Sequence, residues 1–431
     1  MDKYVVKPLV GREDICVEVP GSKSITNRAL MLAALGNCKC EIKGVLFSDD
    51  SRAFLSCLIE LGFDVKISEE DRVVTVVGTS GDIPNKTATI NVRSAGTAAR
   101  FLTVMLSVCG GSYTLNSSEQ MKKRPMAELL DALRDCGVTI NCLEEEGHFP
   151  FEIHSQGLNK NEVTIDTTIS SQYASALLMA SVAYKMNDGL KIHMTGKRTN
   201  GAYIKITTKM MTQFGINFVR ENDTCTVMSN EFGIADYQIE PDASAACYFY
   251  AMAPLLRTKV TVLNLNSDSM QGDMKFARVM ERLGCYVYDT PEGLVVDGRK
   301  VEAFDGINVE MNDFSDQTMT MAVVAIFAKT PTVIENVGHI RMQESDRVAA
   351  IVTELNRMGI QASDYEEQGK TNIKIVPGQI QPAEIETYND HRVAMAFTIV
   401  GLVSEGITIK DPMCCRKTFE NYFEVIDSLY E

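Results

Sequence analysis

The sequence lacks the features that mark several large classes of protein. Its 431 residues carry a net charge of −15, whereas nucleic-acid or anionic-membrane partners demand a basic footprint. Its longest apolar runs, VAMAFTIVGLV and MAVVAIFA, fall short of the roughly 18 residues that a membrane-spanning helix needs. The opening stretch MDKYVVKPLV has the layout of neither a signal peptide nor a transit peptide. We therefore expect a cytoplasmic protein that binds neither nucleic acid nor membrane.

Metal-binding cysteine patterns are also missing. The twelve cysteines include no CxxC pair and no cysteine and histidine cluster at zinc spacing; the closest groupings are Cys38 with Cys40, and Cys414 with Cys415. Free thiols in a reducing cytosol are the expected state. The apolar fraction of 45% and charged fraction of 23% are typical of a globular protein, and the length predicts two domains of roughly 200 residues.

What the sequence does contain is a repeat. Very apolar helical segments begin in polar clusters at intervals of 73 or 74 residues, at Ser24, Thr97, Ser171, Ser244, Gln317 and His391. A second series has an amphipathic helix, a glycine and a short strand. Its glycines are spaced 69 to 78 residues apart, at the position typical of a helix C-terminal cap: Gly62, Gly137, Gly215, Gly284 and Gly359.

Six copies of one unit are the simplest explanation of both series. Each copy predicts a strand, a buried helix, a strand, an amphipathic helix and a hairpin. The sixth copy ends at its second helix, and the N-terminal strand KYVVKPLV could supply a missing strand. We therefore expect one domain of residues 21–240 and another of residues 1–20 plus 241–431, with candidate hinges near Pro20-Gly21 and Pro241-Asp242.

The polar helix starts argue against a scaffold that merely stacks helices. A buried helix leaves unpaired backbone N–H groups and a positive dipole end at its N-terminus, which together suit an anion. PGSKSITNRAL adds Lys23 and Arg28 there, although a capped helix with two solvated cations would explain that segment alone. SAGTAAR and SSQ are equally compatible with tight packing and N-capping. The recurrence of charged groups at equivalent starts, in KKRP, FSDQT, QESDR, NDHR and CRKTF, favours a binding site.

With these segments identified, the chain resembles the 5-enolpyruvylshikimate-3-phosphate synthase family of enolpyruvyl transferases. PGSKSITNRAL, SAGTAAR, KRPM, SSQYASALLM, DASAACYF, ESDR, NDHRVAMAF and RKTFENYFEVI occur in that family's order. The resemblance implies an α/β fold of two similar domains, each with three βαβαββ units around buried parallel helices in an inside-out barrel. It also implies an active site in the cleft between the domains.

The resemblance implies enolpyruvyl transfer from phosphoenolpyruvate to the 5-hydroxyl of shikimate 3-phosphate, with no metal or organic cofactor. It also implies inhibition by glyphosate and action as a monomer. Asp316, Glu344 and Lys23 would be catalytic. Shikimate 3-phosphate would contact Lys23, Ser24, Arg28, Ser170, Ser171, Gln172, Tyr203, Asp316, His339 and Gln343. Phosphoenolpyruvate would contact Lys23, Gly96, Thr97, Arg124, Gln172, Arg347, Arg392 and Lys417.

Four positions depart from the family pattern. Gln343 stands where lysine is usual, Ser94 and His339 stand for asparagines, and Phe101 replaces a proline. Two alternatives stay open. One is UDP-N-acetylglucosamine enolpyruvyl transferase, whose cysteine-bearing loop has no counterpart in NSSEQMKKRPM. The other is a catalytically silent anion-binding relative.

Overall fold

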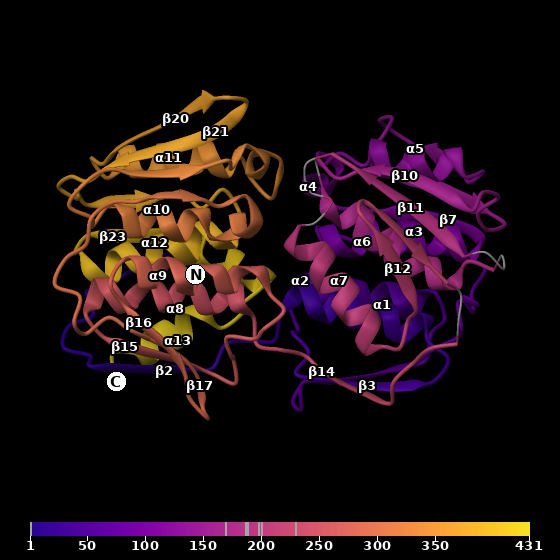
Figure 1. Cartoon of the computed structure of the whole chain (residues 1–431), viewed down its shortest axis with the longest axis horizontal. Coiled ribbons are helices and arrows are strands. Elements are labelled where there is room, and N and C mark those ends of the chain that lie inside the picture. The colour runs from indigo at the N-terminus through magenta and orange to yellow at the C-terminus, as the bar shows by residue number, and fades with distance from the viewer. Residues whose placement is uncertain (1, 169, 186–188, 197–198, 200, 229–230) are drawn as a thin grey trace. The chain divides into compact units, whose positions relative to one another are not determined.

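The computed structural model describes residues 2–168, 170–185, 189–196, 199, 201–228 and 231–431 (Figure 1). The chain divides into two compact units. The terminal unit comprises Met1–Pro20 and Glu240–Glu431, and the central unit comprises Gly21–Ile239. These limits lie one residue from the domain boundary expected near Pro241.

The central unit contains three four-stranded sheets, ordered β14-β3-β5-β4, β6-β7-β9-β8 and β10-β11-β13-β12. Their strands are β3 (Lys39–Lys43), β4 (Val65–Ser68), β5 (Val73–Val77), β6 (Thr87–Asn91), β7 (Gly111–Asn116), β8 (Thr139–Cys142), β9 (Phe151–Ser155), β10 (Glu162–Asp166), β11 (Leu190–Thr195), β12 (Phe218–Glu221), β13 (Thr224–Val227) and β14 (Asp236–Gln238).

The terminal unit has sheets β16-β17-β15-β2 and β18-β19-β21-β20, and a three-stranded sheet β1-β23-β22. Its strands are β1 (Lys3–Val5), β2 (Asp14–Val17), β15 (Lys259–Leu263), β16 (Tyr286–Asp289), β17 (Gly293–Asp297), β18 (Asn308–Glu310), β19 (Thr332–Glu335), β20 (Gln361–Glu367), β21 (Lys370–Val376), β22 (Ala383–Ile385) and β23 (Ile407–Lys410).

All six sheets repeat one pairing pattern. An edge strand runs parallel to its neighbour, as β6 does to β7 and β18 to β19, and the remaining pairs are antiparallel. In the sixth sheet, the antiparallel partner of β23 is β1 from the N-terminus. The sequence prediction that KYVVKPLV completes the last copy is therefore confirmed, as is the α/β fold with six repeats. Across the described residues, the strands form six separate open sheets.

Two strands, β2 and β14, pair with strands that are distant in the sequence. Strand β2 immediately precedes the first core helix, but it pairs in parallel with β15 of the terminal unit. Strand β14 precedes the fourth core helix and pairs in parallel with β3 of the central unit. Each crossing of the chain thus lies between an edge strand and the helix that follows it.

Six apolar helices form the cores. They are α1 (Lys23–Leu35), α3 (Gly96–Cys109) and α6 (Ser171–Ala180) in the central unit, and α8 (Ala243–Leu256), α10 (Thr318–Ala325) and α12 (His391–Val403) in the terminal unit. Each packs against the other two of its unit. In the terminal unit, they lie between the β20–β21 sheet and the β15–β2 sheet (Figure 1). These helices are buried almost all round, so their first turns are the places where polar side chains can gather.

Amphipathic helices cover the sheets. They are α2 (Asp49–Glu60), α4 (Glu119–Lys122), α5 (Ala127–Asp135), α7 (Ala202–Gln213), α9 (Lys275–Arg282), α11 (Arg347–Arg357) and α13 (Tyr422–Ser428). Short 3₁₀ turns complete the fold: η1 (Ser181–Ala183), η2 (Gly272–Met274), η3 (Asn312–Gln317), η4 (Gly338–Met342) and η5 (Pro412–Lys417). No helix among the described residues is long and apolar enough to cross a membrane.

The five repeated glycines end these helices as the sequence predicts. Their φ angles are +87°, +88°, +83°, +99° and +80°, in the left-handed region that favours glycine, at Gly62, Gly137, Gly215, Gly284 and Gly359.

Candidate active site

In the central unit, the first two turns of α1 hold two cations. Lys23 is its first residue, and Nζ lies 3.4 Å from Oδ2 of Asp50. Arg28 is buried one turn later; it donates from Nε to Thr207 Oγ1 at 2.8 Å and from Nη1 to the Ser24 carbonyl at 2.9 Å. The sequence-predicted residues Lys23, Ser24 and Arg28 therefore share one helix start.

The surroundings of Arg28 suit an anionic ligand. Its other described contacts are Ser175 Oγ at 3.2 Å, the Tyr203 carbonyl at 3.3 Å, and the Phe101 and Tyr203 rings. Burial lowers the pKa of Arg28 to about 10, because the charged form loses hydration without gaining a carboxylate among these contacts. A bound anion would supply the missing counter-charge.

The start of α3 is crowded by arginines. A Cβ placed on Gly96 would lie 2.5 Å from Arg124 Nη1 and 3.0 Å from Arg100 Nη1. Thr97 is buried and accepts a hydrogen bond from Asn27 Nδ2 at 2.6 Å, which ties α3 to α1. Gly96 thus permits two guanidinium groups to approach the backbone closely.

The start of α6 offers neutral hydrogen-bonding groups. Ser170 is the N-cap, and its Oγ accepts from the backbone N–H of Gln172 at 3.3 Å. Ser171 is buried at the first helical position, and Oε1 of Gln172 is buried without a hydrogen-bond partner among the described residues. Because α6 packs on both α1 and α3, the three starts form one polar region of the central unit.

In the terminal unit, Arg347 is the centre of a charged cluster. Only 1% of Arg347 is exposed. It contacts Asp390 through Nε at 2.8 Å and Nη2 at 3.2 Å, Asp316 Oδ1 through Nη1 at 3.0 Å, and Glu344 Oε2 through Nη2 at 2.8 Å. These carboxylates raise the pKa of Arg347 above its ordinary value despite burial, and so stabilise the charged guanidinium.

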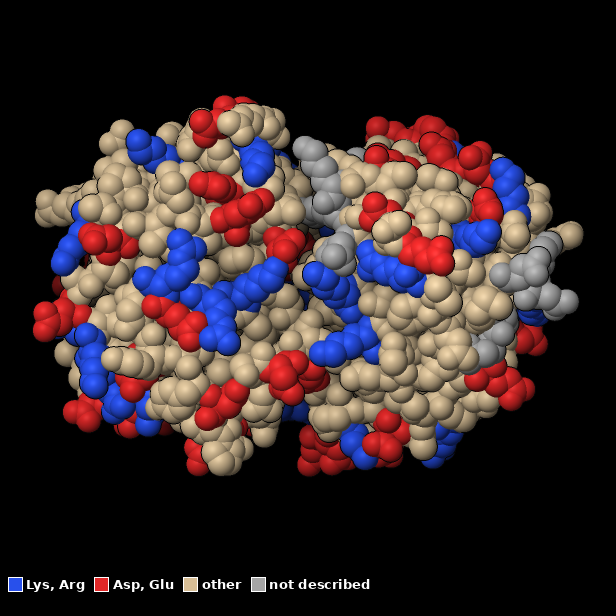
Figure 2. All heavy atoms as spheres, viewed as in Figure 1, with Lys and Arg blue, Asp and Glu red and all other residues tan. Residues whose placement is uncertain are grey.

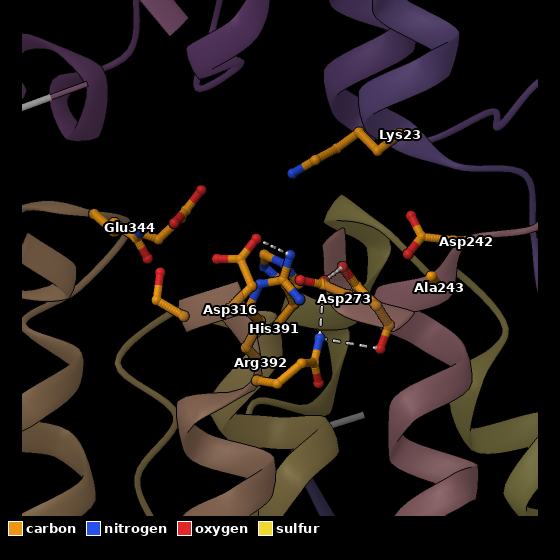
Figure 3. Close-up of polar contacts among 12 residues, drawn as sticks. Lys23, Asp242, Ala243, Asp273, Asp316, Glu344, His391 and Arg392 are labelled. Atoms are coloured by element: carbon orange, nitrogen blue, oxygen red, sulfur yellow. Dashed lines mark hydrogen bonds and ion pairs between the residues drawn. The ribbon is translucent and has the colours of Figure 1, made fainter. Parts of the chain in front are cut away.

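Two further cations complete this cluster. Arg392 Nη2 donates to Asp316 Oδ2 at 2.8 Å, and Lys417 Nζ lies 3.8 Å from Glu344 Oε1. Asp316 and Arg392 lie at the N-terminal end of the core helices, with Glu344 on a neighbouring loop (Figure 3). The five sequence-predicted residues Asp316, Glu344, Arg347, Arg392 and Lys417 thus form one group.

Two of the four departures from the family pattern, Gln343 and His339, lie near this cluster. Gln343 Oε1 accepts a hydrogen bond from Nη1 of Arg347, and Nε2 of His339 lies 2.7 Å from Ser315 Oγ. Gln343 therefore contacts the cluster directly, whereas the described contact of His339 is to the residue before Asp316.

Two residues near the cluster, Asp390 and Asp273, were absent from the sequence prediction of the site. Asp390 caps α12 and binds Arg347; its position in NDHR, at the start of a core helix, was a usable signal. Asp273 accepts hydrogen bonds from Ser244 Oγ and, at 3.1 Å, from Gln317 Nε2, and so joins the starts of α8 and α10. Nothing local in the sequence distinguished Asp273 from a solvated carboxylate.

Comparison with known proteins identifies the family of the chain. The family model described as EPSP synthase (3-phosphoshikimate 1-carboxyvinyltransferase) matches residues 10–426. The chain is 39% identical over 425 residues to the 3-phosphoshikimate 1-carboxyvinyltransferase of Nostoc punctiforme, with 98% of each chain covered. It is 38% identical over 441 residues to the protein of that name from Actinobacillus pleuropneumoniae serotype 5b, with 100% of each covered.

A solved structure shows the same fold. EPSP synthase from Acinetobacter baumannii matches with a TM-score of 0.82 at 21% sequence identity, over 100% of this chain and 98% of that chain. The family match, together with relatives that are similar over their whole length, carries the assignment of activity. The chain belongs to the EPSP synthase family, and its reaction is the transfer of the enolpyruvyl group of phosphoenolpyruvate to shikimate 3-phosphate in the shikimate pathway of aromatic amino acid biosynthesis.

Proposed function

We propose that Glu344 moves the proton at the methylene carbon of phosphoenolpyruvate. The observation that carries this proposal is its position between two cations, 2.8 Å from Arg347 Nη2 and 3.8 Å from Lys417 Nζ. When an anionic substrate competes for Arg347 and Lys417, Glu344 loses these partners and can take up the proton that it then delivers to C3. Glu344 can therefore serve first as acid and then as base.

The proposed reaction has two steps. The 5-hydroxyl oxygen of shikimate 3-phosphate bonds to C2 of phosphoenolpyruvate and loses its proton toward Asp316, while C3 gains a proton from Glu344. The tetrahedral intermediate then returns a C3 proton to Glu344, and the bond from C2 to the phosphate oxygen breaks. Phosphate leaves and the enolpyruvyl ether remains. Cations preorganised around the phosphate lower the barrier to its departure.

We assign substrate contacts by unit. Shikimate 3-phosphate would be held by the central unit, with its charged groups at Lys23 and Arg28 and its hydroxyls near Ser170, Ser171, Gln172 and Tyr203. Asp316, His339 and Gln343 would contribute from the terminal unit. Phosphoenolpyruvate would contact Lys23, Gly96, Thr97, Arg124 and Gln172 of the central unit, and Arg347, Arg392 and Lys417 of the terminal unit.

Charge balance supports this division. In the terminal unit, the cations Arg347, Arg392 and Lys417 already face three carboxylates: Asp316, Glu344 and Asp390. Two multiply negative substrates therefore need additional positive charge, which Lys23, Arg28 and Arg124 of the central unit can supply. We infer that the reaction requires both units to enclose the substrates.

The compartment and the oligomeric state are proposed from the composition and the surface charge. All twelve cysteines lie in the described part of the chain as free thiols, which fits a reducing cytoplasm. Lysine and arginine atoms are interspersed with aspartate and glutamate on the visible surface of each unit (Figure 2). We propose a cytoplasmic monomer whose partners are its two small substrates.

The test is phosphate release from phosphoenolpyruvate with shikimate 3-phosphate as acceptor. We expect phosphate and an enolpyruvyl ether in equal amounts, and no release when UDP-N-acetylglucosamine replaces the acceptor. Release with the sugar nucleotide alone would assign the other enolpyruvyl transfer. Binding of shikimate 3-phosphate without phosphate release would identify a silent relative and contradict the proposed mechanism.

A further inference from the structure

Glu354 is a completely buried carboxylate outside the cluster around Arg347. Its exposed fraction is 0%. Its Oε1 accepts a hydrogen bond from the Tyr388 hydroxyl at 2.6 Å, and its Oε2 accepts one from the backbone N–H of Glu386 at 3.2 Å. Arg357 adds donors at 2.9 Å and 3.3 Å. A buried carboxylate is retained only when such donors replace its hydration.

The segment that Glu354 holds has an unusual backbone. Strand β22 ends at Ile385 and α12 begins at His391. Between them, Tyr388 and Asn389 both lie in the left-handed region, with φ angles of +55° and +52°. Residues other than glycine rarely adopt this backbone conformation. Two such residues in succession persist only where their surroundings hold them.

Helix α11 contacts this segment at two points. Arg347 and Glu354 are seven residues apart, which places them two turns apart on one face of the helix. Arg347 binds Asp390, and Glu354 binds Tyr388 and Glu386. The left-handed pair therefore lies within a loop that one helix fastens at both ends.

The loop leads directly into the cluster. Asp390 caps α12 by accepting from the N–H of Arg392 at 3.0 Å, and the Arg392 side chain reaches Asp316 at 2.8 Å. A change in the turn at Tyr388 would thus rotate the first residues of α12. Arg392 would move away from Asp316 without loss of any group in the cluster.

We propose that Glu354 and Tyr388 are positioning residues, which hold the left-handed turn so that Asp390 and Arg392 face the bound substrate. The proposal rests on the assigned contact between Arg392 and phosphoenolpyruvate. It predicts a specific kinetic signature: weaker use of phosphoenolpyruvate, with use of shikimate 3-phosphate little changed. A purely structural role would instead lower the amount of active enzyme and leave both KM values unchanged.

The central experiment compares two tyrosine hydroxyls. Tyr388→Phe removes the donor to Glu354, and Tyr365→Phe is the matched control, because both residues are 37% exposed and Tyr365 lies on strand β20, outside the loop between β22 and α12. We expect Tyr388→Phe to raise the KM for phosphoenolpyruvate roughly tenfold, the effect of one hydrogen bond to a charged group. The KM for shikimate 3-phosphate should stay within about twofold, as should all parameters of Tyr365→Phe.

Two further variants test whether Glu354 and Tyr388 act through one shared interaction. Glu354→Gln should change kinetics in the same direction as Tyr388→Phe, and the double variant should be no worse than the more impaired single variant, because both remove one interaction. Arg357→Gln removes the half-exposed cation beside Glu354 but leaves the Tyr388 hydrogen bond, so it should lower stability while both KM values stay near wild type. Additive effects of the two single substitutions would overturn the proposal.

A comparison with Arg392→Gln separates this inference from the assignment of the site. An unchanged KM for phosphoenolpyruvate in Arg392→Gln would show that the assigned contact is wrong. A raised KM in Arg392→Gln, with Tyr388→Phe indistinguishable from Tyr365→Phe, would retain the contact and overturn the positioning by Glu354 and Tyr388.

Discussion

At the scale of single residues, Arg347 shows why the cluster must be treated as a unit. Its guanidinium is buried and contacts three carboxylates. Removing one partner of a buried ion pair usually leaves an uncompensated charge that costs about 3–5 kcal/mol. Substitutions that keep shape and hydrogen bonding are therefore the informative ones in this cluster.

Glu344→Gln is such a substitution. The glutamine keeps an oxygen that can accept a hydrogen bond from Arg347, but it has no carboxyl proton to give to C3. Turnover should therefore fall by roughly 10²-fold or more. Shikimate 3-phosphate should still bind, which calorimetry can measure alongside phosphate release. Glu367→Gln, on the exposed end of β20, is the control and should retain full turnover. Near-normal turnover in Glu344→Gln would remove this residue from the proposed mechanism.

Gln343→Lys restores the residue usual in the family. In this chain Gln343 accepts from Arg347, so a lysine would replace an acceptor by a like charge beside a buried guanidinium. We expect turnover between pH 6 and 9 to be unchanged or reduced, with Lys23 compensating for the missing lysine. Lys23→Met should then abolish turnover. A tenfold rise in Gln343→Lys would show instead that the enzyme lacks electrostatic support at this position.

At the scale of elements, the helix-ending glycines make a prediction about stability. Gly215 has a φ of +83° with no atom within 4 Å of an added Cβ, whereas a Cβ on Gly137 would lie 2.2 Å from Asn159 Nδ2. Gly215→Ala should therefore cost only the left-handed backbone penalty, about 1–2 kcal/mol in the free energy of unfolding. Gly137→Ala should cost more in urea denaturation. Equal losses of unfolding free energy in the two variants would mean that the Asn159 side chain moves aside at no cost.

Asp273 joins the first turns of α8 and α10 and predicts a pH dependence. Burial, reinforced by the charge of Asp316, raises the pKa of Asp273 to about 6 from an ordinary value of 3.8. The folded state therefore binds more protons than the unfolded state between these values, and this group's contribution to stability falls as the pH rises through that window.

Asp273→Asn removes this titration. Urea denaturation should show that the stability of the variant relative to wild type increases between about pH 4 and pH 6. Other carboxyls titrate in both proteins, so the difference between the two curves isolates Asp273. Parallel curves would contradict the raised pKa.

At the scale of the whole molecule, the proposed contacts are divided between two units joined by two crossings of the chain. If shikimate 3-phosphate draws the units around itself, its saturation should reduce the radius of gyration measured by small-angle scattering. Shikimate without the phosphate, at the same concentration, is the control and should have a smaller effect. An unchanged profile at saturation would argue against closure driven by this substrate.

The repeat, the α/β class and the polar helix starts that are proposed to carry the site follow from the sequence alone. These features depend on neighbours within a few residues, such as apolar periodicity and the glycines at helix ends, so the chain displays them directly. The segments that resemble the enolpyruvyl transferases also identified Asp316, Glu344, Arg347, Arg392 and Lys417, which the structure brings together.

The partners that these residues take depend on tertiary packing. Arg347 and Asp390 are 43 residues apart, and Glu354 and Tyr388 are 34 apart. Neither pair shares an element, so local patterning is silent about them. The strand partners of β2 and β14 are equally hidden, because a strand's hydrophobic pattern indicates which face is buried but not which neighbour pairs with it. Long-range packing selects those neighbours. It also leaves Glu354 fully buried and holds Tyr388 and Asn389 in the left-handed region, two features that the sequence alone would not predict.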